Sequence, residues 1–173
     1  MNDAANEGNR AAGSATAVER ASDRELILRR TFKARPATLF DAMTRPELLR
    51  RWWAPRALGV ELFECHADAR VGGTYRFVFG HPGRPPMAFS GVYREVVAAA
   101  RLVYTQIFEP MREAGEGLVT ATFEAVPGGT RLVQRELYPS KEVLDGAIAS
   151  GMERGMRQTL DQLEVLLEEL SRT

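Results

Sequence analysis

Apolar residues occupy every second position over much of the chain, the spacing of β-strands that bury one face. Residues 24–32 begin this pattern, with Leu26, Leu28 and Phe32 on one side. The alternation returns in six segments separated by short turns rich in glycine and proline, which predict strands at 60–65, 74–79, 88–96, 102–108, 118–125 and 130–137. Because connections this short join antiparallel neighbours, we predict a seven-stranded antiparallel sheet.

Helical spacing of apolar residues predicts three helices. Two short ones follow the first strand: one opens at Pro36, and the other at residues 44–47, whose Thr-x-x-Glu pattern is that of a capping box. The last begins with Ser140 as its N-cap, and apolar residues then recur every three or four positions as far as Leu170. We expect one continuous helix of about seven turns, roughly 40 Å long.

Three glycines, Gly146, Gly151 and Gly155, fall in the first half of this last helix. Each weakens a helix by about 1 kcal/mol relative to alanine. We favour the interpretation that they allow a close approach of the helix backbone to the sheet. The alternative is that they leave room for a ligand beside Met152 and Met156, whose flexible side chains adapt to irregular space.

A sheet with one apolar face needs a cover, and only the last helix is long enough to provide it. The order of elements predicts an α+β helix-grip fold, in which a curved seven-stranded sheet wraps round a long C-terminal helix. Such a sheet encloses a cavity where it diverges from the helix. Residues 1–22 contain no Leu, Ile, Phe, Tyr or Trp, so we predict a disordered tail there and a single domain over residues 23–171.

Composition narrows the class of protein. The chain carries 23 basic and 23 acidic residues, so it lacks the basic excess typical of nucleic-acid binders. It has no apolar run long enough for a membrane span and no recognisable secretory signal. Its single cysteine, Cys65, cannot form an internal disulfide, which favours a cytoplasmic location.

Charge is distributed unevenly along the chain. Residues 24–56 hold nine basic against three acidic residues, whereas residues 136–170 hold eight acidic against three basic. We predict a dipolar surface; the alternative is that the basic segment forms a partner site.

Several motifs resemble one known family: Pro36, residues 44–48, Trp52-Trp53, and residues 68–76, 91–93, 101–105, 129–132 and 151–163. They resemble the bacterial relatives of the C-terminal domain of the heat-shock-protein-ninety ATPase activator, in the START-like superfamily of lipid carriers and polyketide cyclases. The resemblance covers residues 24–170 and implies a START-like helix-grip domain. That scaffold serves carriers, cyclases, hydrolases, resistance proteins and chaperone partners, so it implies no single activity. Many relatives carry Gly-Trp where this chain has Gly151-Met152 and Gly155-Met156.

Residues able to support catalysis are few. Glu64, His66 and Asp68 alternate along one segment, but three residues of one extended run spread over about 13 Å, so we expect no metal site. Cys65 is interpreted as a small buried hydrophobe. The sequence has neither a nucleophile elbow nor a phosphate-binding glycine loop, and we expect no cofactor.

The predicted strands carry aromatic residues with polar ones among them. An inward-facing polar side chain needs a protein partner or a ligand, because an unpaired one costs about 1–3 kcal/mol. Of the adjacent Trp52 and Trp53, we expect one in the core and the other at the mouth of a pocket or against a partner. The predicted ligand-binding residues are Trp53, Tyr75, Phe77, Phe89, Tyr93, Tyr104, Gln106, Gln134, Glu136, Met152 and Met156.

We therefore favour a carrier, sensor or sequestering protein that binds a small, largely apolar molecule between the sheet and the last helix. One alternative is a cyclase-like or hydrolase-like enzyme in which Glu136, Tyr104 or Arg76 serves as acid, base or oxyanion partner. Another is a protein-interaction or chaperone-partner module with a filled core and an exposed apolar patch near Trp52. We expect no nucleic-acid partner. A homodimer is possible, because the edge strands of a sheet can pair with those of a second copy.

Overall fold

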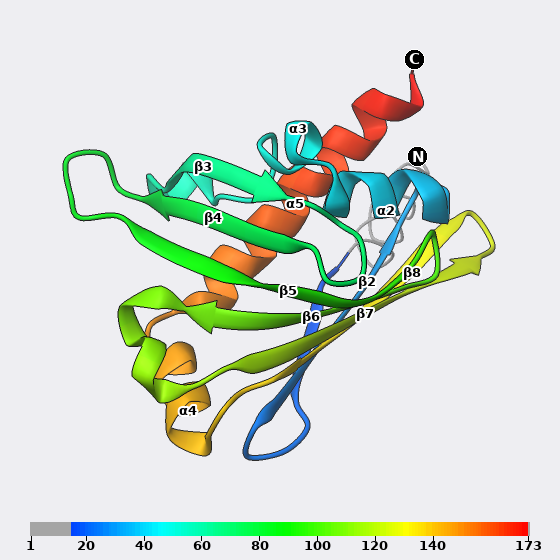
Figure 1. The fold of residues 1–173 in the computed structure, drawn as a ribbon. Helices are drawn as coiled ribbons and strands as arrows, with labels where there is room; N and C mark the ends of the chain where they lie inside the picture. The colour runs from blue at the N-terminus through cyan, green and yellow to red at the C-terminus, as the bar shows by residue number, and fades with distance from the viewer. Residues whose placement is uncertain (1–14, 173) are drawn as a thin grey trace, which may run out of the picture.

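One curved antiparallel sheet dominates the fold (Figure 1). The computed structural model describes residues 15–172, and the strand order is β1-β2-β8-β7-β6-β5-β4-β3. All seven predicted strands are present, with ends that differ by no more than two residues. The strands are β1 Ala17–Arg20, β2 Glu25–Phe32, β3 Glu61–Ala67, β4 Thr74–Gly80, β5 Met87–Val97, β6 Arg101–Phe108, β7 Gly117–Val126 and β8 Gly129–Leu137.

The prediction of seven strands is wrong, because β1 adds an eighth within the segment predicted as a disordered tail. β1 pairs antiparallel with β2, and Val18 lies opposite Leu28. Two arginines hold the chain just before it: Arg30 Nη1 donates to Thr16 Oγ1 at 3.0 Å, and Arg157 Nη1 donates to the Thr16 carbonyl. β1 is thus stabilised by main-chain pairing with β2 and by contacts with residues distant in sequence, without an alternating apolar pattern of its own. Residues 1–14 of the predicted tail lie outside the described residues.

The two short helices follow β2 as predicted, as α2 Pro36–Thr44 and α3 Pro46–Leu49. The predicted capping box does not form. Thr44 Oγ1 donates instead to the Phe40 carbonyl at 2.8 Å. Arg45 is the N-cap of α3, and its side chain does not cap the helix backbone. Two short 3₁₀ helices, η1 Arg56–Leu58 and η2 Glu109–Ala114, complete the connections.

The C-terminal segment forms two helices, so the prediction of one continuous helix is wrong. Ser140 caps α4 Lys141–Ala149 as predicted, since its Oγ accepts from Val143 N at 3.2 Å. The chain then turns at Gly151, whose φ of +82° is left-handed, and α5 Met152–Ser171 lies across the sheet (Figure 1). The apolar spacing continues through the turn, which is why the pattern does not reveal it.

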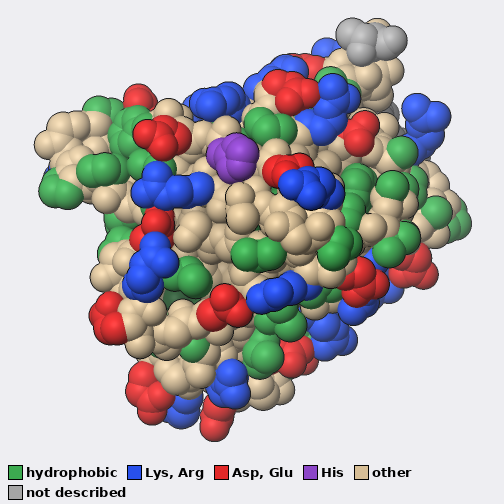
Figure 2. Space-filling model, viewed as in Figure 1, with side chains coloured by type: hydrophobic (Ala, Val, Ile, Leu, Met, Phe, Trp, Pro, Cys, Tyr) green, Lys and Arg blue, Asp and Glu red, His purple; other side chains and the backbone are tan. Residues whose placement is uncertain are grey.

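The two oppositely charged segments contact each other. The Arg30 side chain, 2% exposed, pairs with Asp161 at 2.7 Å and with Glu164 at 2.5 Å. Arg51 pairs with Glu169 of the same helix. The basic segment therefore pairs with three acidic residues of the acidic segment. Acidic and basic side chains are interspersed over the face seen in Figure 2.

A tightly packed core fills one part of the space under the sheet. Phe32 of β2, Leu39 of α2, Leu132 of β8 and Leu163 of α5 have no exposed surface and belong to one cluster. Over residues 15–172, no helix combines the length and apolar character needed to cross a membrane.

Candidate ligand-binding cavity

A hollow of about 580 Å³ lies in the remaining space between the sheet, α4, the first half of α5 and the Trp52-Trp53 segment. Cavities that hold small molecules in proteins measure about 300–1,000 Å³. Strands β4 to β8 form one wall, and the two C-terminal helices supply the opposite wall through residues such as Ala147 and Met156.

All eleven residues predicted for the ligand site line this hollow. Their role in binding stays a prediction, but the structure brings them together from four strands, the Trp52-Trp53 segment and α5. They are Trp53, Tyr75, Phe77, Phe89, Tyr93, Tyr104, Gln106, Gln134, Glu136, Met152 and Met156.

Aromatic rings form the end of the hollow next to β4 and β5. The Trp53 ring centroid lies 5.0 Å from that of Phe77 and 5.2 Å from that of Phe79. Phe79 and Phe89 stack at 5.4 Å, and Phe108 lies 5.2 Å from Phe89. Pairs at these distances stabilise one another beyond the area they bury, so this end has firm apolar walls.

Tyr75 spans the floor between three strands. Its hydroxyl donates to the Thr105 carbonyl of β6 at 2.6 Å, across Gly91 of β5. A Cβ at Gly91 would lie 2.0 Å from the Thr105 carbonyl oxygen and 2.7 Å from Tyr75 Cε1, so only glycine leaves room for the ring. Burial raises the pKa of Tyr75, which keeps the phenol neutral and donating.

Glu136 is the centre of the polar end. Its Oε1 accepts from Gln134 Nε2 at 2.8 Å, and its Oε2 accepts from the Tyr138 hydroxyl at 2.9 Å. Burial raises the pKa of Glu136, and the two hydrogen bonds oppose that rise because they favour the ionised form. The Tyr138 hydroxyl also lies 3.4 Å from Met152 Sδ, which ties β8 to α5.

Two further tyrosines present hydroxyls that are free of protein partners. Within residues 15–172, the hydroxyls of Tyr93 and Tyr104 make no hydrogen bond, and both side chains line the hollow. Burial raises the pKa of each, so both remain neutral phenols. A neutral phenol both donates and accepts a hydrogen bond, and a ligand in the hollow can use either capacity.

The glycines of the C-terminal helices leave open space. A Cβ at Gly146 would meet nothing within 4 Å, and one at Gly155 would meet only Pro55 Cγ at 3.7 Å. The favoured interpretation, a close approach of these glycines to the sheet, is therefore wrong. Both glycines line the hollow instead, while Gly151 is required by its left-handed backbone.

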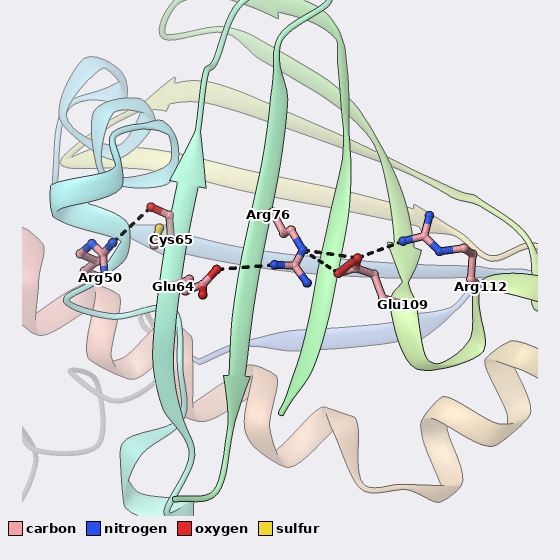
Figure 3. A network of polar contacts seen from close by, with 6 residues as sticks. All are labelled: Arg50, Glu64, Cys65, Arg76, Glu109 and Arg112. Carbon is pink, nitrogen blue, oxygen red and sulfur yellow. Dashed lines mark hydrogen bonds and ion pairs between the residues drawn. The ribbon is translucent and has the colours of Figure 1, made fainter. Parts of the chain in front are cut away.

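The structure places Arg76 outside the hollow, contrary to the enzyme hypothesis. It lies on β4 between Tyr75 and Phe77, so its side chain points to the opposite face. There it pairs with Glu109 at 2.9 Å and with Glu64 at 3.5 Å, as Figure 3 shows. Of the three proposed catalytic groups, only Glu136 and Tyr104 reach the hollow, and no hydrogen bond joins them.

Both adjacent tryptophans line the hollow, so the predicted division between core and pocket is present only in part. Trp52 also belongs to the core: it is 6% exposed, and its Nε1 donates to the Ala42 carbonyl at 2.8 Å. Trp53 is partly buried and packs against the core. The exposed apolar patch expected near Trp52 for an interaction module is therefore not formed by Trp52 itself.

No group of three potential metal ligands occurs in the described part of the chain. Glu64 and His66, from the run with metal-ligand spacing, are exposed, and Glu64 pairs with Arg76. Cys65 is buried, and burial raises the pKa of its thiol, which keeps it protonated and unreactive.

The lining residues outside the predicted ligand set include Phe79, Phe108 and Tyr138. Phe79 and Phe108 follow Phe77 and Gln106 by two positions, so strand alternation places them on the same face. Tyr138 follows Glu136 by two positions but lies beyond the end of β8. Strand alternation could therefore have identified Phe79 and Phe108. It is a weaker guide for Tyr138, because alternation applies only within a strand.

Comparison with known proteins identifies relatives of this architecture. Residues 33–168 match the family described as Activator of Hsp90 ATPase homolog 1-like protein. A crystal structure from Rhodobacter sphaeroides is 30% identical, with a TM-score of 0.82 over 90% of this chain and 99% of that one. One from Nitrosomonas europaea is 22% identical, with a TM-score of 0.77 over 89% and 100% of the two chains.

An AHSA1-like protein from Aeromonas hydrophila, solved by NMR, is 18% identical, with a TM-score of 0.68 over 85% of this chain and 94% of that one. At this identity the likeness concerns the fold alone. No curated protein matches the chain in sequence.

Proposed function

The chain belongs to the Activator of Hsp90 ATPase homolog 1-like family, and on that premise we propose that it binds a small, largely apolar molecule in the hollow. It does so without a cofactor, as a carrier, sensor or sequestering protein. We place this activity in the cytoplasm, because Cys65 is the only cysteine and suits a reducing compartment.

The observation that carries the proposal is the hollow itself, with its division into an aromatic end and a polar end. A protein interior is normally close-packed, and voids larger than a water molecule are few. This domain keeps about 580 Å³ open beside a core whose leucines are fully buried. The free hydroxyls of Tyr93 and Tyr104 offer the few polar contacts that orient an apolar guest.

Native mass spectrometry of protein purified from its own host tests the proposal. We expect the folded protein to carry an additional mass of a few hundred daltons that is lost on denaturation. The variant Ala147→Phe places a ring in the hollow and should abolish the additional mass. Ala149→Phe makes the same change two residues along α4, at an exposed position outside the lining, and should retain it.

A protein without a retained mass that also fails to take up added apolar compounds would contradict the proposal. Equal loss of the additional mass in Ala147→Phe and Ala149→Phe would also contradict the proposal, because the binding would then not involve the hollow.

A further inference from the structure

The hollow contains acidic groups and no basic ones. Among the described residues that line it there is no Arg, Lys or His, while Glu136 and Glu142 both contribute. Glu142 lies at an exposed position of α4, and Glu136 lies deep on β8. An anionic guest would lose its hydration here without gaining a positive partner, which is unfavourable for a carboxylate or phosphate.

Glu136 has unused capacity to accept hydrogen bonds. Its two oxygens offer about four lone-pair sites, and Gln134 and Tyr138 each occupy one. The titratable groups that face it are the phenols of Tyr75, Tyr104 and Tyr138, and its negative charge adds to the burial that raises their pKa values. None of these groups is positive. Within the hollow, a positive partner for Glu136 would have to come from a ligand.

The aromatic end complements such a ligand. Glu136 lies on β8 and Phe77 on β4, four strand spacings apart, or roughly 19 Å at about 4.8 Å per spacing. An elongated molecule can therefore place an apolar body among Trp53, Phe77 and Phe89 while its polar head reaches Glu136. Aromatic faces attract cations, so the tyrosines around Glu136 add to the preference for a positive head group.

We propose that the ligand is an apolar amine bound as a cation, with its ammonium group on Glu136 and its body in the aromatic end of the hollow. This inference rests on the proposed function and narrows it to one chemical class.

Three probes with one elongated apolar body test the charge preference: 6-(2-naphthyl)hexylammonium, 6-(2-naphthyl)hexan-1-ol and 6-(2-naphthyl)hexanoate. Isothermal titration calorimetry at neutral pH should give an affinity for the amine at least tenfold above that for the alcohol, with the carboxylate weakest. Equal binding of amine and alcohol, or tighter binding of the carboxylate, would overturn the amine assignment and leave the hollow as a binding site. Failure of all three to bind would instead count against the proposed function.

The variant Glu136→Gln tests the assigned contact. It should lose at least tenfold in affinity for the amine and keep its affinity for the alcohol within about twofold, which also shows that the variant is folded. Glu124→Gln makes the same change of charge at an exposed position of β7 outside the lining and should alter amine binding by less than about threefold. An amine preference that survives Glu136→Gln, or that is lost equally in Glu124→Gln, would overturn the assignment.

A permanently charged probe, 6-(2-naphthyl)hexyl-trimethylammonium, adds a pH test. Its affinity should fall as the pH drops through the raised pKa of Glu136, by at most tenfold per pH unit because one proton is involved. Binding of the alcohol should stay constant over the same range. A quaternary ammonium affinity that is equally constant would contradict an ionic contact with Glu136.

Discussion

The two halves of α5 face the same sheet, yet one half fills the space beneath it and the other leaves it open. The second half carries Leu163, Leu166 and Leu167, all buried, with Leu163 at 0% exposure. The first half presents glycine and methionine to the hollow. A single amphipathic helix can thus complete a core and bound a cavity, and the volumes of its inward side chains decide which it does.

The largest expected difference between the two halves is in the cost of truncation. Leu163→Ala should lower the free energy of unfolding by about 2–5 kcal/mol, because it removes a fully packed side chain and leaves a cavity. Met156→Ala should cost about 1 kcal/mol or less, because Met156 borders open space already. Urea unfolding at neutral pH measures both values, and equal losses would show that the first half is packed as tightly as the second.

Charge sharpens the comparison. Asp161 and Glu164 of α5 pair with the buried Arg30 of β2 beside the filled core, whereas Glu136 in the hollow has only neutral partners. Its pKa is raised in the folded state. The contribution of Glu136 to the free energy of unfolding is therefore full below the pKa that its carboxyl has in the unfolded chain. It is lost as the pH rises through the higher pKa of the folded state. Relative to wild type, Glu136→Gln should gain stability as the pH rises, by at most about 1.4 kcal/mol per pH unit.

Urea unfolding of wild type and Glu136→Gln at a series of pH values measures this gain. The matched variant Glu124→Gln removes a carboxylate from an exposed position of β7 outside the hollow and is measured as the control. A difference between wild type and Glu136→Gln that does not vary with pH would contradict the assigned protonation behaviour.

Gly146 of α4 and Gly151, which precedes α5, should respond to alanine in opposite directions. Gly151→Ala should cost roughly 1–2 kcal/mol, because a Cβ is strained at its left-handed φ. Gly146→Ala should stabilise α4 by about 0.5–1 kcal/mol, since a Cβ there meets nothing within 4 Å. Thermal unfolding followed by circular dichroism compares the two, and destabilisation by both would mean that Gly146 also needs its conformational freedom.

The sheet could be predicted closely because alternation records which face of each strand is buried. β1 escaped prediction because Val18 is its only large apolar residue and its stability comes from pairing with β2 and from contacts of Arg30 and Arg157 with Thr16. The turn at Gly151 escaped because the apolar spacing is the same on both sides of it. β1 is determined by contacts between residues distant in sequence, and the turn is determined by the backbone angle of Gly151. Neither is visible in a local apolar pattern.

Residues that form the walls of the candidate site could also be predicted from the sequence. Residues such as Tyr104 and Glu136 were predicted from their positions within strand patterns, and both line the hollow. Arg76 was misassigned although its place between Tyr75 and Phe77 already puts it on the opposite face of β4. On that face it pairs with Glu64 and Glu109. The hydrogen bond from Tyr138 to Glu136 depends on the chain path beyond β8, which no spacing encodes.

The hydrogen bond of Tyr75 across Gly91 links the evolution of two positions. A relative that keeps a tyrosine at the place of Tyr75 can accept a side chain at the place of Gly91 only if the phenol moves and β5 separates from the Thr105 carbonyl. The two residues should therefore covary among homologous sequences, and a homologue that has replaced the tyrosine with a smaller residue is where a substituted glycine should first be found.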